Sequence, residues 1–190
     1  MASIKEVKSE LRKATRKALR ALNAEERAAS DKAIFEQVVN FSEYKKAETV
    51  FLYVGIDWEI NTMPLIEDAL SKGKKVSLPL ITGEGIMEGR YIESLDDLTA
   101  GAFDIPEPKA ETKFTAMEEI DLALIPCVAC DASCMRLGQG GGFYDRFMKS
   151  RSFKTAALCR GIALLDKIPA GRYDLPADYV ITEDRIYCKA

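Results

Sequence analysis

The stretch Thr49–Leu80, TVFLYVGIDWEINTMPLIEDALSKGKKVSLPL, decides the fold class. Its first seven residues are β-branched, aromatic or aliphatic and end in a glycine, a pattern typical of a buried strand. Thr62 can cap a following helix, which ends at Gly73. Lys74–Leu80 has the composition of a second strand. Strand, helix and strand in series predict two parallel strands joined by a right-handed crossover.

The rest of the chain alternates in the same way. Ser3, in a capping box with Glu6, can begin a first helix, and Asn23 can cap a second. The later elements expected are a buried strand, a helix and two further strands, at Asp121–Cys127, Phe143–Ser150, Thr155–Cys159 and Tyr179–Thr182. We therefore predict one domain over residues 1–190, an α/β three-layer sandwich with a central, mostly parallel sheet. Ligands of such sheets bind beyond the carboxyl ends of the strands.

Two segments carry more specific expectations. An apolar stripe along the first helix should face the core, and it comprises Ile4, Val7, Leu11, Ala14, Ala18 and Leu22. Lys8 and Arg12 lie on another face, four residues apart, and are either part of a solvated basic face or an anion-binding edge. Gly101–Pro108 is predicted to be a loop, because its prolines cannot donate to a strand ladder.

Composition excludes several classes of protein. The 190 residues are 47% hydrophobic and 30% charged, which is ordinary for a globular protein with its own core. A net charge of −3 argues against general nucleic-acid binding, and no run of 18 apolar residues or signal peptide is present. We expect a cytoplasmic monomer that binds neither nucleic acid nor membrane. The chain has no histidine, so any catalysis uses carboxylates, Lys, Arg, Tyr, backbone amides or a bound ion.

Three closely spaced cysteines leave a metal or redox site open. Cys127, Cys130 and Cys134 have a spacing that a metal could use, but a structural zinc site needs a fourth ligand. Cys159 and Cys188 stand alone in the sequence. Because Cys127 ends an apolar strand, the favoured interpretation is that these cysteines fill space in the core.

A glycine-rich segment is the second candidate site. Arg136–Arg146, RLGQGGGFYDR, lies between a strand and a helix. Its glycines allow a phosphate to approach successive main-chain amides, and the helix start adds a positive dipole. Arg136 can clamp phosphate oxygens, and Asp145 can hold Mg²⁺. The alternative is a tight glycine turn with a structural Arg–Asp pair.

The same segment, preceded by Ile125-Pro126, resembles the signature of the 5-formyltetrahydrofolate cyclo-ligase family, also called 5,10-methenyltetrahydrofolate synthetases. Other stretches resemble the family in the right order, and they are Lys8–Arg12, Tyr53–Thr62, Phe103–Pro108 and Asp174–Asp178. The resemblance covers nearly the whole chain. It implies the fold of the NagB, RpiA and CoA-transferase group.

The resemblance also implies roles for individual residues. Lys8, Arg136 and Asp145 would be catalytic, and Asp145 and Asp174 would bind Mg²⁺. The residues that would contact ATP are Lys8, Ser9, Glu10, Leu11, Arg12, Arg136, Leu137, Gly138, Gln139, Gly140, Gly141, Gly142, Phe143 and Tyr144. Those that would contact the folate are Arg12, Val54, Glu59, Gln139, Gly140, Gly141, Gly142 and Phe143.

The family reaction converts 5-formyltetrahydrofolate and ATP into 5,10-methenyltetrahydrofolate, ADP and phosphate. The resemblance implies that the formyl oxygen is phosphorylated and that N10 then closes the ring. This chain departs from its relatives at four positions, where Cys130, Cys134, Gln139 and Tyr173 replace residues common in the family. The cysteines are expected to pack, whereas Gln139 and Tyr173 bear on substrate contacts. A binding module that has lost catalysis is the alternative function.

Overall fold

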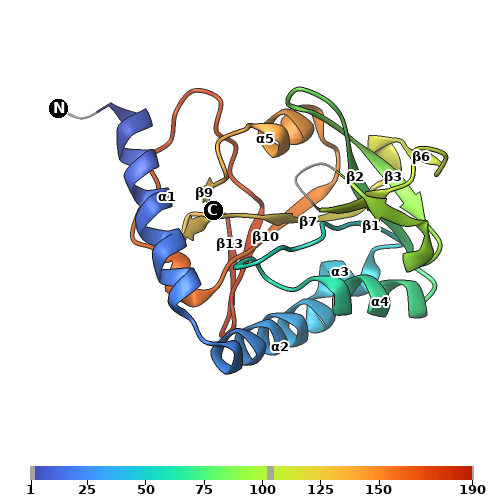
Figure 1. Cartoon of the computed structure of the whole chain (residues 1–190), viewed down its shortest axis with the longest axis horizontal. Helices are drawn as coiled ribbons and strands as arrows, with labels where there is room; N and C mark the ends of the chain where they lie inside the picture. The colour runs from blue at the N-terminus through green and yellow to red at the C-terminus, as the bar shows by residue number, and fades with distance from the viewer. Residues whose placement is uncertain (1–2, 102–104, 190) are drawn as a thin grey trace.

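The computed structural model describes residues 3–101 and 105–189. Within these residues a central eight-stranded sheet is covered by helices on both faces (Figure 1). Its strands, in spatial order, are β13 (Ile186–Cys188), β12 (Tyr179–Ile181), β10 (Lys154–Leu158), β7 (Leu122–Pro126), β1 (Thr49–Phe51), β2 (Lys75–Gly83), β3 (Ile86–Ile92) and β6 (Phe114–Thr115). The five strands from β12 to β2 are parallel, and antiparallel pairings add the remaining strands at the edges. The predicted three-layer fold with a mostly parallel sheet is confirmed.

Two core clusters fill the space between the layers. On one face the sheet packs against α2 (Ala24–Asn40), α3 (Ser42–Lys46) and α4 (Met63–Ser71). On the other it packs against α5 (Phe143–Phe147) and the end of α1 (Ile4–Ala21). Strand β7 shows the alternation that a sheet buried on both faces requires. Leu122 and Leu124 enter the first cluster, whereas Ala123 and Ile125 enter the second.

The strand–helix–strand unit predicted from Thr49–Leu80 is present, because β1 and β2 are parallel and α4 lies between them in sequence. The predicted first strand was too long. β1 ends at Phe51, and the turn comes later, at Asp57 and Trp58. The Thr62 hydroxyl donates to the Tyr53 carbonyl and accepts from the Gly55 amide at 3.0 Å. Thr62 is the N-cap residue of α4, but its side chain makes no capping bond there. Its hydroxyl instead fixes the turn at the carboxyl end of β1.

Shorter elements complete the fold. A three-stranded sheet contains β11 (Leu164–Leu165), β8 (Ala129–Asp131) and β9 (Arg136–Leu137). Single 3₁₀ turns occur at Leu95–Asp97, Met117–Glu119, Met148–Ser150 and Gly161–Ala163 (η5). The helix predicted over Phe143–Ser150 is therefore α5 followed by a 3₁₀ turn. None of the described helices is both long and apolar enough to span a bilayer.

The prediction of a loop over Gly101–Pro108 was partly wrong. Ala102–Asp104 lie outside the described residues, but Pro106–Pro108 forms β5, which pairs antiparallel with β4 (Leu98–Ala100). The two form a ribbon of their own rather than a part of the central sheet. Proline is tolerated in such an edge strand, where its missing N–H can face away from the partner.

The inward face of α1 differs from the predicted apolar stripe. Ile4 and Val7 are exposed, whereas Lys8, Thr15 and Leu19 are the buried residues of the helix. The capping box of Ser3 and Glu6 is present as predicted. The face of α1 that packs against the rest of the protein therefore begins with Lys8, which is only 8% exposed. The interpretation of a solvated basic face is wrong for Lys8, because that side chain meets an acidic partner in the site.

Candidate active site

The glycine segment lies between β9 and α5 and is bordered by α1. Gly140 and Gly142 have positive φ angles of 109° and 70°, which only glycine adopts without strain. Gly142 is the N-cap residue of α5. The Arg12 guanidinium donates through Nε to the Gly138 carbonyl at 2.8 Å, which ties the start of the segment to α1. On its other side Arg146 donates to the Gly141 carbonyl and, at 2.7 Å, to the carbonyl of Gly85.

Two ion pairs hold the predicted metal carboxylates. Arg136 Nη2 lies 2.8 Å from Asp145 Oδ1, and the Lys8 ammonium pairs with Asp174. Asp145 Oδ1 also accepts from the Leu175 amide at 3.2 Å, so the two carboxylates belong to one neighbourhood. The Arg136 side chain is 2% exposed, and its Nε has no hydrogen-bond partner among the described residues. A buried guanidinium with a free donor is suited to an anionic ligand.

The charge on Asp174 is stabilised by these neighbours. Burial raises the pKa of this carboxyl, but hydrogen bonds from Lys8 and from the Gly171 amide outweigh that effect and hold the pKa below its ordinary value. The attraction of Arg136 acts in the same direction. Asp174 is therefore ionised at neutral pH, as a magnesium ligand must be.

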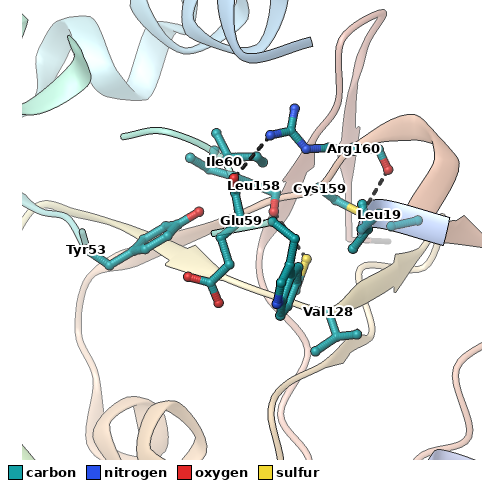
Figure 2. A pocket seen from close by; sticks show the side chains of 11 residues that line it. Leu19, Tyr53, Glu59, Ile60, Val128, Leu158, Cys159 and Arg160 are labelled. Atoms are coloured by element: carbon teal, nitrogen blue, oxygen red, sulfur yellow. Dashed lines mark hydrogen bonds between the residues drawn. The ribbon is translucent and has the colours of Figure 1, made fainter. Parts of the chain in front are cut away.

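Glu59 begins a second part of the site, beyond the carboxyl end of β1. It lines a small cavity of about 10 Å³ together with Tyr53, Trp58 and residues that follow β7 and β10 (Figure 2). Burial raises the pKa of the Glu59 carboxyl. Gln139 donates to its Oε1 at 3.0 Å, and Arg16 donates to Gln139 in turn. The chain of contacts from α1 through Gln139 to Glu59 joins the glycine segment to this cavity.

Not every predicted residue takes part in these contacts. Ser9 and Glu10 lie on the exposed side of α1, while Leu11 packs against a small core cluster with Leu137. Val54 is buried in the core cluster that also contains residues of α2, and it makes none of the polar contacts described above. Tyr173, one of the departures from relatives, is 78% exposed. The structure thus brings together the charged residues and the glycines, but not these side chains.

Several residues of the site were missed or given no role. Arg160 follows β10, has a side chain that is 2% exposed, and donates to Asp31 at 2.7 Å and to the Glu59 carbonyl at 3.1 Å. Its place directly after a strand was a signal, since ligands gather at carboxyl ends. Arg16 and Arg146 now connect to the glycine segment.

The cysteine group also differs from the prediction. Cys127, Cys130 and Cys159 converge, whereas Cys134 is not part of the group and Cys159 does not stand alone. Burial raises the pKa of the Cys130 thiol, and hydrogen bonds from Cys127 and Cys130 lower that of Cys159. Burial raises the pKa of Cys134 to about 11. Cys130 and Cys134 are both buried in the core, as the packing interpretation expects.

Comparison with known proteins bears on what this site does. The model of the 5-formyltetrahydrofolate cyclo-ligase family matches residues 4–183. The chain belongs to this family. It is 31% identical over 197 residues to a probable 5-formyltetrahydrofolate cyclo-ligase of Caenorhabditis elegans, with 96% of each protein covered. The cyclo-ligase of Escherichia coli K12 is 28% identical over 176 residues, which cover 88% of this chain and 96% of that protein.

Solved structures agree with the assignment to the cyclo-ligase family. The NMR structure of Aquifex aeolicus 5,10-methenyltetrahydrofolate synthetase superposes with a TM-score of 0.87 at 31% identity, covering 96% of this chain and 92% of that chain. The Mycoplasma pneumoniae 5,10-methenyltetrahydrofolate synthetase shares the fold, with a TM-score of 0.76 at 22% identity. The resemblance seen in the sequence is confirmed. The correspondence with the NagB, RpiA and CoA-transferase group stays a prediction.

Proposed function

We propose that this cyclo-ligase converts 5-formyltetrahydrofolate and ATP into 5,10-methenyltetrahydrofolate, ADP and phosphate. One observation carries the proposal. In this member of the family, the ion pairs Lys8–Asp174 and Arg136–Asp145 lie around a glycine segment with positive φ angles. Each of these features suits the handling of a nucleotide triphosphate. Glu59, which Gln139 joins to the segment, is the neighbouring group that we assign to the folate.

The chemistry starts from a poor leaving group. If N10 attacked the formyl carbon directly, the formyl oxygen would have to leave as oxide, which is a very poor leaving group. The formyl oxygen therefore attacks the γ-phosphorus of ATP, and the bond to the ADP oxygen breaks. N10 then adds to the activated carbon and loses its proton, and the phosphate departs with the former formyl oxygen. No step needs a nucleophile from the protein, which agrees with a chain without histidine.

The protein's part is to position the phosphates and offset their charge. Amides of Gly138–Gly142 and the start of α5 face the phosphates in this proposal, and Arg136 clamps their oxygens. Lys8 and Arg136, which now neutralise Asp174 and Asp145, are placed to turn to those oxygens. Arg12 holds the Gly138 carbonyl and so orients the segment. Lys8, Arg136 and Asp145 are the catalytic residues that we propose.

Asp145 and Asp174 are the proposed Mg²⁺ ligands. Two carboxylates fit this ion, which takes one or two of them and completes its shell with water and phosphate oxygens. The hydrogen bond from the Leu175 amide to the Asp145 carboxylate joins the two segments that carry these residues. Mg²⁺ supplies neutralisation of phosphate charge when it is bound. Asp174 keeps its charge for the ion through the pairing with Lys8, which lowers the pKa of its carboxyl.

Glu59 is the proposed anchor of the folate. Its half-buried carboxylate can accept from pterin N–H groups, which replace the amide of Gln139 as the donor. Gln139 would then be free to turn toward either substrate. Because Gln139 contacts both α1 and Glu59, its position couples the two substrate sites.

An absorbance assay tests the proposed reaction. Protein mixed with Mg-ATP and 5-formyltetrahydrofolate should produce the near-ultraviolet absorbance of the methenyl product together with stoichiometric ADP. Omission of ATP should abolish both signals. Binding of both ligands without ADP release would overturn the proposal and favour a binding module that has lost catalysis.

A further inference from the structure

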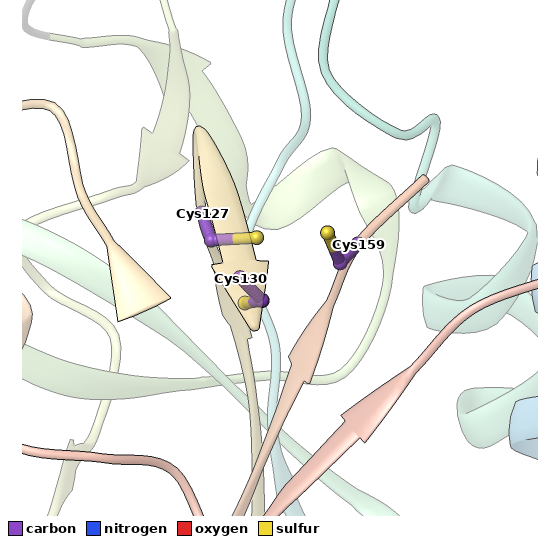
Figure 3. Close-up of side chains that lie close together, drawn as sticks. All are labelled: Cys127, Cys130 and Cys159. Carbon is purple, nitrogen blue, oxygen red and sulfur yellow. The ribbon is translucent and has the colours of Figure 1, made fainter. Parts of the chain in front are cut away.

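Three thiols converge beside the small cavity at Glu59. Cys127 follows β7, Cys130 lies in β8, and Cys159 follows β10 (Figure 3). Their sulfur atoms all lie within 4.8 Å of one another, and none is in a disulfide. The proposed reaction assigns no role to any of them.

Sheet register explains why two of these residues meet. Pro126 of β7 pairs with Leu158 of β10, so the residues that come next, Cys127 and Cys159, leave adjacent parallel strands side by side. Neighbouring strands are about 4.8 Å apart, which places these two side chains in mutual reach. Cys130 joins them because the chain turns into β8 two residues after Cys127. The arrangement is thus fixed by the backbone of the central sheet.

The surroundings of the trio are enclosed but accessible from one side. Cys130 and Cys159 are buried, whereas Cys127 is half-buried. Cys127 and Cys159 line the small cavity that Glu59 and Trp58 also line. Two buried guanidiniums, of Arg136 and Arg160, each keep an Nε without a partner among the described residues. Arg160 lines the same cavity as Cys127 and Cys159, so its guanidinium can offset negative charge on the sulfurs.

The donor set points to a particular kind of ion. Thiolates select soft metals such as Cu(I) and zinc. Zinc needs four ligands, but the group found among the described residues has only three. A metal–sulfur bond of about 2.3 Å would put three sulfurs about 4.0 Å apart around a central ion, so only a small inward movement is needed. Three sulfurs in a nearly dry enclosure therefore favour a monovalent, three-coordinate ion over zinc.

We propose that Cys127, Cys130 and Cys159 form a three-coordinate site for one Cu(I) ion. The site is distinct from the proposed Mg²⁺ ligands and does not depend on the proposed ligase reaction. Binding displaces thiol protons, so the affinity for copper should rise with pH.

A titration with Cu(I) tests the proposal. Reduced protein, titrated without oxygen in the presence of a competing Cu(I) chelator, should bind one ion per chain and develop thiolate-to-copper charge-transfer absorption in the ultraviolet. X-ray absorption should report three sulfur neighbours. Cys127→Ala and Cys159→Ala should each weaken the affinity by more than about 100-fold, because loss of a ligand should exceed the 10- to 100-fold effect of losing an outer-shell partner.

A matched double variant provides the control. C134A/C188S removes the two cysteines outside the trio, one buried and one exposed, and should keep the affinity of the wild type. Thermal unfolding of every variant shows which remain folded. If one of the single variants Cys127→Ala and Cys159→Ala does not fold, the other still tests the site. Equal loss of copper binding in C134A/C188S would overturn the proposal. So would tighter binding of Zn²⁺ than of Cu(I), or a sulfur count other than three.

Discussion

The ion pair between Arg136 and Asp145 joins the two roles that the glycine segment has to combine. The guanidinium is buried and is the proposed phosphate clamp, whereas the carboxylate is the proposed metal ligand. Each group offsets the charge of the other while no ligand is bound. We therefore expect that removal of either Arg136 or Asp145 weakens ATP use more than folate binding.

Asp145→Asn tests this arrangement. The amide keeps the shape of the side chain but loses the charge that binds Mg²⁺, so turnover with Mg-ATP should fall by about 100-fold or more, while folate affinity changes less than about threefold. Steady-state assays and calorimetric folate binding measure the two effects. Asp68→Asn, which removes a lysine-paired carboxylate on α4, is the control and should leave both nearly unchanged. Equal loss of ATP use and folate binding in Asp145→Asn would contradict the assigned role.

Glu59 should give folate binding a characteristic pH dependence. Because burial raises the pKa of this carboxyl, the charged form that accepts pterin N–H groups is lost as the pH falls through a value above the ordinary one for glutamate. Folate affinity should therefore be full above that pKa and weaken below it. Glu59→Gln should weaken binding by about 10- to 100-fold at neutral pH, as expected for a charge-assisted hydrogen bond, and remove this pH dependence. An unchanged profile in the variant would exclude Glu59 as the titrating group.

The sequence indicated residues of the site that lie close together in the chain. Arg136, the glycines and Asp145 fall within one segment of ten residues, so their chemistry could be inferred without the fold. Cys159 and Arg160 could not be placed in that way. They meet Cys127 and Glu59 only because β10 lies next to β7 in the sheet, and strand order is not encoded in spacing.

At the scale of elements, the turn into α5 depends on a left-handed residue. Gly142 has a φ of 70°, and a Cβ at this position would lie 2.9 Å from Arg146 Nη1. Arg146 itself holds the Gly141 and Gly85 carbonyls. A side chain at Gly142 would therefore disturb both the backbone of the segment and the arginine that supports it.

Comparison of two glycine variants isolates this effect. Gly73 also has a φ of 70°, but it lies after α4 with nothing within 4 Å of a Cβ. Gly142→Ala and Gly73→Ala should each cost about 1–2 kcal/mol of unfolding free energy for the left-handed backbone. Only Gly142→Ala should also weaken ATP binding. Denaturant unfolding and nucleotide titration measure the two quantities, and an equal effect of both variants on ATP binding would refute the role given to the segment.

The existence of the long helices and strands could be predicted better than the residues at which they end or the face that each helix buries. The helix of α1 and its capping box follow from sequence, but the face that docks does not, because Lys8 is buried through its pairing with Asp174, 166 residues away. Likewise the Pro106–Pro108 strand was excluded by a rule for central strands that does not apply to an edge ribbon. In both cases a tertiary partner overrode a local preference.

At the scale of the whole molecule, ligand binding should stabilise the fold. The site joins α1, the glycine segment and the region of Asp174, so binding energy is linked to unfolding of the entire domain. Mg-ATP at about 100 times its dissociation constant should add about 2.7 kcal/mol, or about 5–11 °C in Tm for a chain of this size. Asp145→Asn should lose this shift but retain the shift with folate. A full Mg-ATP shift in that variant would show that Asp145 is not needed for nucleotide binding.

The contact between Lys8 and Asp174 also sets an order of events during synthesis. At about 5–20 residues per second, a ribosome takes about 8–30 s to make the 166 residues that separate the two. During that time α1 has left the ribosome without the segments on which it docks, since the Gly138 carbonyl and the η5 turn are also made late. Its exposed Lys8, Thr15 and Leu19 are then available to chaperones. The proposed nucleotide site is thus among the last parts of this protein to become complete.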